Sequence, residues 1–185
     1  MQKELGMGRA AAGALLALAF FGVSVARATT PASMDVRELT RQATYVARAR
    51  CVNVLSTMEM GMVWTLNTFE VTESWKGEPP PRFTVRLPGG EAGGQRMTVE
   101  GAPRFTEGEE VVLFVTEDRG RQMNIVGWAQ GTFRIRKSRR TGIEKAIQDT
   151  ATGQAASVHS GASAEDERKR IPLGTLRGMV EQAKQ

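Results

Sequence analysis

The chain of 185 residues has a single cysteine and a single histidine. Cys51 cannot form an internal disulfide, so the packed core alone must stabilise the fold. It lies among Val46, Val52 and Val54, which predicts a buried and inert thiol in a strand. A cysteine nucleophile also needs a base, and the only histidine, His159, lies in a polar segment.

Catalytic and metal-binding motifs are missing as well. The sequence has no His-Glu-x-x-His, no Gly-x-Ser-x-Gly and no Cys-x-x-Cys. Glu107, Glu109 and Glu110 flank a turn, where we expect them to be solvated. An acid–base pair of carboxylates stays open, but the sequence singles none out. We therefore predict that the chain is not an enzyme and has no catalytic, metal-binding or cofactor-binding residues and no cofactor.

One apolar run is present, at the start of the chain. Lys3 and Arg9 precede an uncharged stretch, Ala10 to Val25, that ends in the small-x-small sequence Ala26-Arg27-Ala28. This order predicts a cleavable signal peptide over residues 1–28, a mature N-terminus at Thr29, and export to the periplasm or the extracellular medium. An uncleaved N-terminal anchor is the alternative. No later run approaches the ~20 apolar residues of a membrane span.

Net charge gives little guidance to a partner. The formal charge is +5, and residues 1–28 hold three basic residues and one acidic residue, so the mature chain would carry +3. So mild an excess does not indicate nucleic acid, and we expect another exported protein or an envelope component as the partner.

The pattern after the signal peptide is mostly that of short strands. Ser33 can cap a short helix through Ala43, and longer strands are expected over Tyr45 to Leu55 and Met62 to Trp75. Arg82 to Leu87 alternates most cleanly, with apolar residues at every second position. Further strands are expected around Met97 and Val99, over 110–116, over 123–128 and from Gly131 through Ile135. The 111–115 run of apolar residues predicts burial on both faces.

From Lys137 the composition becomes polar. Ala146-Ile147 and Ala155–Val158 could pair as a hairpin, residues 159–170 are expected to form a linker, and Ile171 to Ala183 a final helix with Leu173, Leu176, Met179, Val180 and Ala183 on one side. The predicted domains are a barrel over 29–136 and a polar hairpin, linker and helix over 137–185. The fold class is mainly β: a small OB-like barrel with a short N-terminal helix and a C-terminal hairpin plus helix.

Two segments are distinctive enough to contact a partner. Gly89, Gly90, Gly93 and Gly94 lie in a loop from Pro88 to Gly94, which lacks the Lys-Ser/Thr pair and following helix of a phosphate-binding loop. We expect a flexible connection between strands that lets a partner approach the backbone. The other segment is a basic run that would attract an acidic partner. It contains Arg134, Arg136, Lys137, Arg139 and Arg140. A solvated edge strand is the alternative for this run.

Met58, Met60 and Met62 recur at every second residue. In an extended strand this spacing would put three thioethers on one side, and soft sulfur ligands suit Cu(I). A periplasmic Cu(I)-handling protein is therefore the alternative function. Methionine also fills gaps in apolar cores, which needs no metal.

Residues 35–136 resemble the netrin-like domains, which are the OB-type barrels of the tissue inhibitors of metalloproteinases, and exported bacterial proteins of similar layout. Three motifs carry the resemblance: the strand from Ala43-Thr44-Tyr45-Val46 to Val52, the strand from Phe69-Glu70-Val71 to Trp75-Lys76-Gly77, and the glycine-led strand from Gly108 to Phe114. The resemblance implies an OB-like barrel. The zinc-chelating N-terminal cysteine of the animal inhibitors has no counterpart after Thr29, so that mechanism and its residues do not carry over. The sequence therefore predicts a non-catalytic binding module, acting on or with a secreted protease or an envelope component.

Overall fold

A computed structural model describes residues 34–149 and 170–184. The helices and strands within these ranges, in chain order, are α1 (Val36–Gln42), β1 (Tyr45–Glu59), β2 (Met62–Lys76), β3 (Arg82–Pro88), β4 (Gly90–Ala92), β5 (Gln95–Met97), β6 (Glu110–Glu117), β7 (Met123–Ile125), the 3-10 turn η1 (Trp128–Gly131), β8 (Thr132–Lys137), β9 (Glu144–Gln148), β10 (Arg170–Pro172) and α3 (Leu173–Ala183). The expected signal peptide lies outside the described residues.

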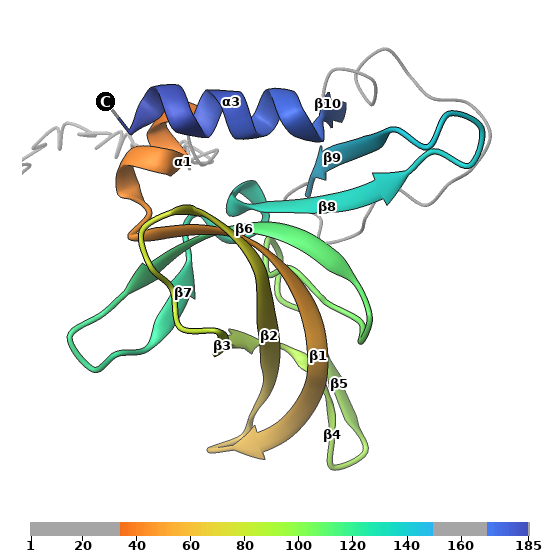
Figure 1. The fold of residues 1–185 in the computed structure, drawn as a ribbon. Coiled ribbons are helices and arrows are strands. Elements are labelled where there is room, and N and C mark those ends of the chain that lie inside the picture. The colour runs from red at the N-terminus through yellow and green to blue at the C-terminus, as the bar shows by residue number, and fades with distance from the viewer. Residues whose placement is uncertain (1–33, 150–169, 185) are drawn as a thin grey trace, which may run out of the picture. The chain divides into compact units, whose positions relative to one another are not determined.

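Five strands close into a barrel of the OB-like kind that the sequence predicts (Figure 1). The order around the barrel is β1-β2-β3-β7-β6, and β6 pairs back onto β1. β3 and β7 run parallel, whereas the other neighbours are antiparallel. β6 pairs with β7 along its second half and with β8 along its first half. After β7 the chain passes through η1 into β8, which is outside the barrel but belongs to the same sheet.

The sheet continues beyond the barrel through β8, β9 and β10. The C-terminal hairpin is formed by β8 and β9, with partners from Phe133↔Gln148 to Lys137↔Glu144. The expected pairing of Ala146-Ile147 with 155–158 is wrong, because the two edges of β9 pair with β8 and β10 at those residues. Residues 155–158 themselves lie outside the described ranges.

Two apolar cores lie on the two faces of β6, as its uninterrupted apolar run predicts. The barrel core takes every second residue of β6 together with the inward-facing residues of β1, β2, β3 and β7. Its buried members are Ala49, Cys51, Phe69, Phe83, Val85, Leu87, Phe105, Val111, Leu113, Val115, Met123 and Ile125. The helix-side core packs the other face of β6 against both helices. It comprises Leu39, Ala43, Val46, Trp75, Val112, Phe114, Val126, Phe133, Ile135, Ala146, Leu176 and Val180.

α1 and α3 lie side by side over the helix-side core (Figure 1). The N-cap of α1 is Asp35, whose Oδ1 accepts a hydrogen bond from the Glu38 N–H at 2.7 Å; the expected cap Ser33 lies outside the described residues. In α3, Leu176 and Val180 are buried as expected, but Met179 is 43 % exposed and does not belong to the packed face.

The Trp75-Lys76-Gly77 motif joins β2 to α1 and serves the fold. Trp75 is buried in the helix-side core, and the Lys76 ammonium donates to the Thr40 and Ala43 carbonyls at the end of α1, both at 2.6 Å. Gly77 has φ +65°, and a Cβ there would lie 2.7 Å from the Thr44 carbonyl oxygen. Only glycine permits this close approach.

Candidate functional site

The glycine-rich segment forms a hairpin rather than a loose connection. β4 and β5 pair antiparallel from Gly90↔Met97 to Ala92↔Gln95, and Gly93 and Gly94 form the turn with φ +58° and +73°. Positive φ at both central residues is typical of the tight type I′ turn. The four glycines therefore divide into an exposed pair at the tip and a pair, Gly89 and Gly90, at the base.

The base of this hairpin rests directly on β1 and β2. A Cβ on Gly90 would collide with the Thr65 Oγ1 and would lie 2.6 Å from the Ser56 Oγ. The Thr65 hydroxyl donates to the Gly89 carbonyl at 2.6 Å, and the Ser56 and Thr65 hydroxyls lie 2.8 Å apart. Glycine is thus required at position 90, because any side chain would push the hairpin away from Ser56 and Thr65.

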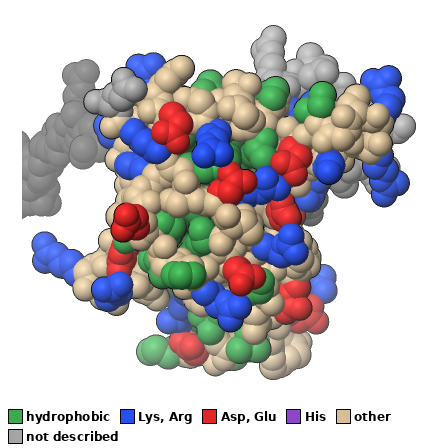
Figure 2. All heavy atoms as spheres, in the orientation of Figure 1, with side chains coloured by type: hydrophobic (Ala, Val, Ile, Leu, Met, Phe, Trp, Pro, Cys, Tyr) green, Lys and Arg blue, Asp and Glu red, His purple; other side chains and the backbone are tan. Residues whose placement is uncertain are grey.

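The basic run does not form one surface. The Arg134 residue is 5 % exposed, whereas Arg136, Arg139 and Arg140 are exposed. Arg136 donates to the Glu109 Oε1 at 3.1 Å, and Arg139 and Arg140 lie in the turn between β8 and β9. In Figure 2 basic and acidic side chains are mixed over the barrel, and basic side chains gather at the outer end of the β8–β9 hairpin. Arg134 is therefore too buried to contact a partner, whereas Arg139 and Arg140 in the β8–β9 turn are exposed.

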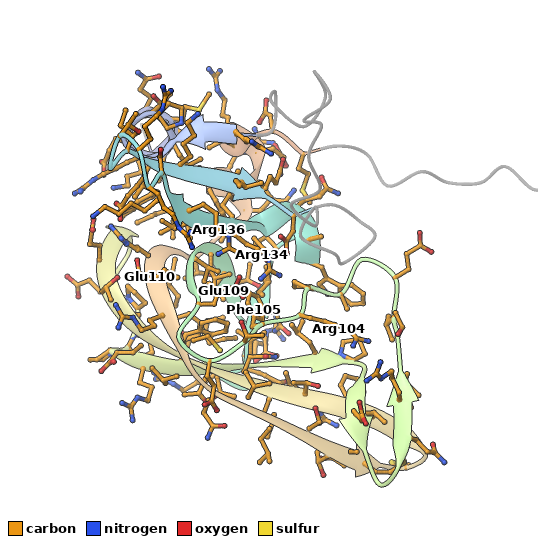
Figure 3. All side chains as sticks on the ribbon, turned by 90° about the vertical axis from the view of Figure 1, so that its right-hand side faces the viewer. Arg104, Phe105, Glu109, Glu110, Arg134 and Arg136 are labelled. Carbon is orange, nitrogen blue, oxygen red and sulfur yellow. The ribbon has the colours of Figure 1, made fainter. Side chains whose placement is uncertain are left out.

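Arg134 is the centre of a buried ion cluster. Its Nε and Nη2 bind Asp149 Oδ1 and Oδ2 at 2.6 and 2.8 Å, and its Nη1 lies 2.5 Å from the Glu109 Oε2. The Nη2 also donates to the Arg104 carbonyl at 2.6 Å, and the guanidinium carbon lies 5.5 Å from the Phe105 ring centroid. Figure 3 shows Arg134 and Arg136 on β8 beside Glu109 and Phe105. One side chain thus holds segments around residues 104, 109 and 149 together.

The two carboxylates of the cluster are buried, which corrects the expectation for Glu109. The side chains of Glu109 and Asp149 are 7 % and 2 % exposed. Burial raises the pKa of the Asp149 carboxyl, and the bonds to Arg134 oppose that rise. Burial alone would lower the pKa of the Arg134 guanidinium, but its bonds to Asp149 and Glu109 raise it. Glu110 is partly exposed, and its pKa is lowered by the hydrogen bond from Arg48.

A pocket of about 160 Å³ opens at this end of the barrel, between the hairpin base and the segment 103–105. We call it the barrel-end pocket. It is lined by Val54, Ser56, Thr65, Asn67, Leu87, Pro88, Gly89, Gly90, Pro103, Arg104 and Phe105. Arg134 donates a hydrogen bond to the Arg104 carbonyl and packs against the Phe105 ring, and so supports this wall of the pocket. The glycine hairpin and the buried arginine, which the sequence suggested separately, therefore support opposite walls of one pocket.

Asn67 gives this pocket an unusual polar group. The residue is 1 % exposed, and its Nδ2 donates to the Thr65 carbonyl at 3.2 Å. Within the described part of the chain its Oδ1 has no hydrogen-bond partner. A buried acceptor without a partner costs stability, so such atoms are rare in folded proteins.

A second hollow lies on the outside of the barrel, where β3 and β7 share one partner pair, Val85↔Met123. This groove measures about 550 Å³, and its lining includes Leu66, Phe83 and Met123 with Arg82 and Arg121. Each of those two arginines already has an acidic neighbour, Glu70 or Glu117. Arg86 also lines the groove; its Nη2 pairs with Glu59, whereas its buried Nε has no hydrogen-bond partner among the described residues.

The three methionines do not lie on one face, so the geometric basis of the copper alternative is wrong. The chain turns at Met60-Gly61, which puts Met58 on β1 and Met62 on β2. Met58 pairs with the buried Val63 and faces inward, whereas Met62 pairs with Glu59 on the outer face and is 40 % exposed. Among residues 34–149 and 170–184, no cluster of three or more His, Cys, Asp or Glu side chains is placed to bind a metal ion.

The glycines stand out in the sequence, but the residues beneath them do not. Ser56, Thr65, Asn67 and Phe105 lie on strands or segments expected to be purely structural. One signal was available for Asn67: it occupies an inward-facing position of β2, between Thr65 and Phe69, where an apolar residue is the norm.

In the described part of the chain, no helix has the length and apolar character needed to cross a membrane.

Comparisons of this chain with protein-family models, with curated proteins and with solved structures found no match.

Proposed function

We propose that this chain is an exported, non-catalytic binding module with a netrin-like form of the OB-like barrel, and that its partner contacts the barrel end. The observation that supports this best is the barrel-end pocket, whose lining includes Asn67, a buried residue with an acceptor that has no partner among the described residues. Binding surfaces are commonly built on loops carried by a rigid scaffold. Here the hairpin base is fixed by Thr65, and the opposite wall by Arg134.

Binding suits these residues better than catalysis. The two hydroxyls in the pocket bond to each other and to the Gly89 carbonyl, and the residues lining the pocket include no His, Asp or Glu that would activate them. The only ionised side chain in the lining is Arg104, which donates to the Met97 carbonyl and to the Thr98 hydroxyl. Such a set can orient a bound group, but it has no base to remove a proton.

The partner we propose is another exported protein, such as a secreted protease, or a component of the cell envelope. Export itself rests on the signal-peptide pattern of residues 1–28. The exposed arginines of the β8–β9 turn are the alternative contact surface, and binding there would be sensitive to salt.

The test is affinity capture from the native exported fraction with matched charge reversals. Arg104→Glu reverses a charge at the pocket rim, and the double variant Arg139→Glu, Arg140→Glu reverses charges at the β8–β9 turn. We expect the first to lose the captured partner and the second to keep it, with unchanged circular dichroism for both. Capture that survives Arg104→Glu but fails in the double variant would place the contact on the basic turn instead.

A further inference from the structure

The hydrogen atoms of the barrel-end pocket can be assigned from its contacts. The single hydroxyl proton of Thr65 goes to the Gly89 carbonyl, so in the Ser56–Thr65 pair the donor must be Ser56. The Nδ2 of Asn67 donates to the Thr65 carbonyl. The lone pairs of Ser56 and one N–H of the Asn67 amide are still available, but the buried atom without any partner among the described residues is the Asn67 Oδ1, an acceptor. A group that satisfies this atom must therefore be a hydrogen-bond donor.

Charge narrows the class of donor. The residues lining the pocket include no carboxylate, and their one ionised group is the Arg104 guanidinium. An ammonium group entering here would lose its hydration without gaining a counter-charge and would meet a cation at the rim. An uncharged N–H or O–H group has neither penalty.

Size and surface narrow it further. The volume of about 160 Å³ is well below that of a pocket for a whole cofactor or drug-sized ligand, which runs to several hundred Å³. The rest of the lining is apolar and includes Val54, Leu87 and Phe105. The pocket thus fits one side-chain-sized group with an apolar stem.

We propose that the barrel-end pocket selects an uncharged hydrogen-bond donor, a carboxamide or alcohol on a short apolar stem, which donates to the Oδ1 of Asn67. The proposal rests on the proposed function and names the chemistry that the partner must present at the same site. The ligand's donor gives the Asn67 Oδ1 a hydrogen-bond partner, which no residue of the described ranges provides. This explains why a polar side chain occupies an inward-facing position of β2.

Three small probes of similar size test the selectivity: propionamide, methyl acetate and propylammonium. Each is titrated into the full-length mature protein, and binding is followed by the backbone amide NMR shifts of Asn67, Gly90 and Phe105. We expect propionamide to bind about tenfold more tightly than methyl acetate, which has the same number of heavy atoms but no donor. Propylammonium should bind more weakly than propionamide. Equal binding of propionamide and methyl acetate, or no saturable shift with propionamide, overturns the proposal.

Two variants link the selectivity to Asn67. Asn67→Leu removes the acceptor, and we expect it to abolish the preference for propionamide. Asn67→Asp keeps an acceptor and adds a negative charge, so at pH 8 it should shift the preference toward propylammonium. If both variants keep the wild-type preference, Oδ1 is not the selecting atom and the proposal is wrong.

Partner capture separates this proposal from the proposed function. Capture that is lost in Arg104→Glu but unaffected by Asn67→Leu contradicts the donor proposal and leaves the barrel-end contact in place. Capture that survives Arg104→Glu contradicts the proposed function itself.

Discussion

Arg134 and Asp149 form a bidentate ion pair inside the protein, with Nε–Oδ1 and Nη2–Oδ2 distances of 2.6 and 2.8 Å and side chains 6 % and 2 % exposed. The pair joins β8 to the end of β9, and Glu109 extends it to the start of β6. A buried charge is tolerated only when it is paired and hydrogen-bonded. Arg134 meets this condition through two carboxylates and a backbone carbonyl.

Removing Arg134 should therefore destabilise the fold strongly. Arg134→Met keeps much of the apolar stem but leaves Glu109 and Asp149 buried without their partner. We expect a loss of about 3–5 kcal/mol in the free energy of unfolding at neutral pH, measured by urea denaturation. The control is Arg139→Met, at an exposed position, which should cost much less.

The pH dependence of that loss has a definite sign. Burial holds the pKa of Asp149 above its ordinary 3.8, so the folded protein keeps a proton to higher pH than the unfolded chain. The stability that the protonated Asp149 contributes is fully present below the pKa of the unfolded chain, and it is lost as the pH rises through the higher pKa of the folded protein. Without Arg134 the effect grows, so the difference between wild type and Arg134→Met should be larger at pH 8 than at pH 5. A difference that shrinks on going to pH 8 would contradict this account of the cluster.

Phe83 and Arg82 test the alternation of β3. Phe83 is buried and packs 5.6 Å from the Phe69 ring centroid, whereas Arg82 is exposed. Phe83→Ala should cost about 3–5 kcal/mol and Arg82→Ala less than about 1 kcal/mol. The midpoint of urea denaturation measures both. Equal shifts for the two variants are incompatible with the strand register described above.

Two glycines should respond to alanine in opposite directions. Gly77 has φ +65°, and an added Cβ would meet the Thr44 carbonyl oxygen and the Tyr45 ring, so Gly77→Ala should destabilise by more than about 1 kcal/mol. Gly174 lies in α3, where an added Cβ would have no neighbouring atom within 4 Å, so Gly174→Ala should stabilise by about 0.5–1 kcal/mol. Thermal melts of the two variants against wild type give the comparison. Shifts of the same sign would show that the local backbone differs from the one described.

Cys51 should be chemically inert in the folded protein. It is fully buried in the barrel core, and burial raises the pKa of its thiol to about 11. The thiolate, which is the reactive form, is then scarce at neutral pH. We expect no alkylation by iodoacetamide over hours at pH 8 and rapid alkylation in denaturant, followed by intact mass. Rapid reaction of the native protein would contradict the burial of this strand.

Most strands of the barrel could be predicted from the sequence, because burial of one strand face produces a periodic pattern of apolar residues. The alternation of Arg82–Leu87 and the apolar run of β6 correctly identified one strand with a single buried face and another with two. These features depend on neighbours in the chain, which a single sequence can show.

The candidate site was harder to predict because its contacts are long-range. Arg134 and Asp149 are 15 residues apart, and they meet only because β8 and β9 pair and the segment before β6 covers their outer side. A run of arginines gives no sign that one of them is buried. The orphan acceptor on Asn67 depends on the hairpin base and on segment 103–105, neither of which adjoins β2 in sequence.

The central claim is that a partner contacts the barrel end, and site-specific photo-crosslinking in the native host tests it most directly. A photoactivatable phenylalanine analogue is placed either at Thr98, beside Arg104 on the pocket rim, or at Arg139 in the β8–β9 turn. We expect a discrete crosslinked adduct from Thr98 and none from Arg139, with the Thr98 adduct lost in the Arg104→Glu background. An adduct from Arg139 alone, or none from Thr98 when the partner is captured, would contradict the claim.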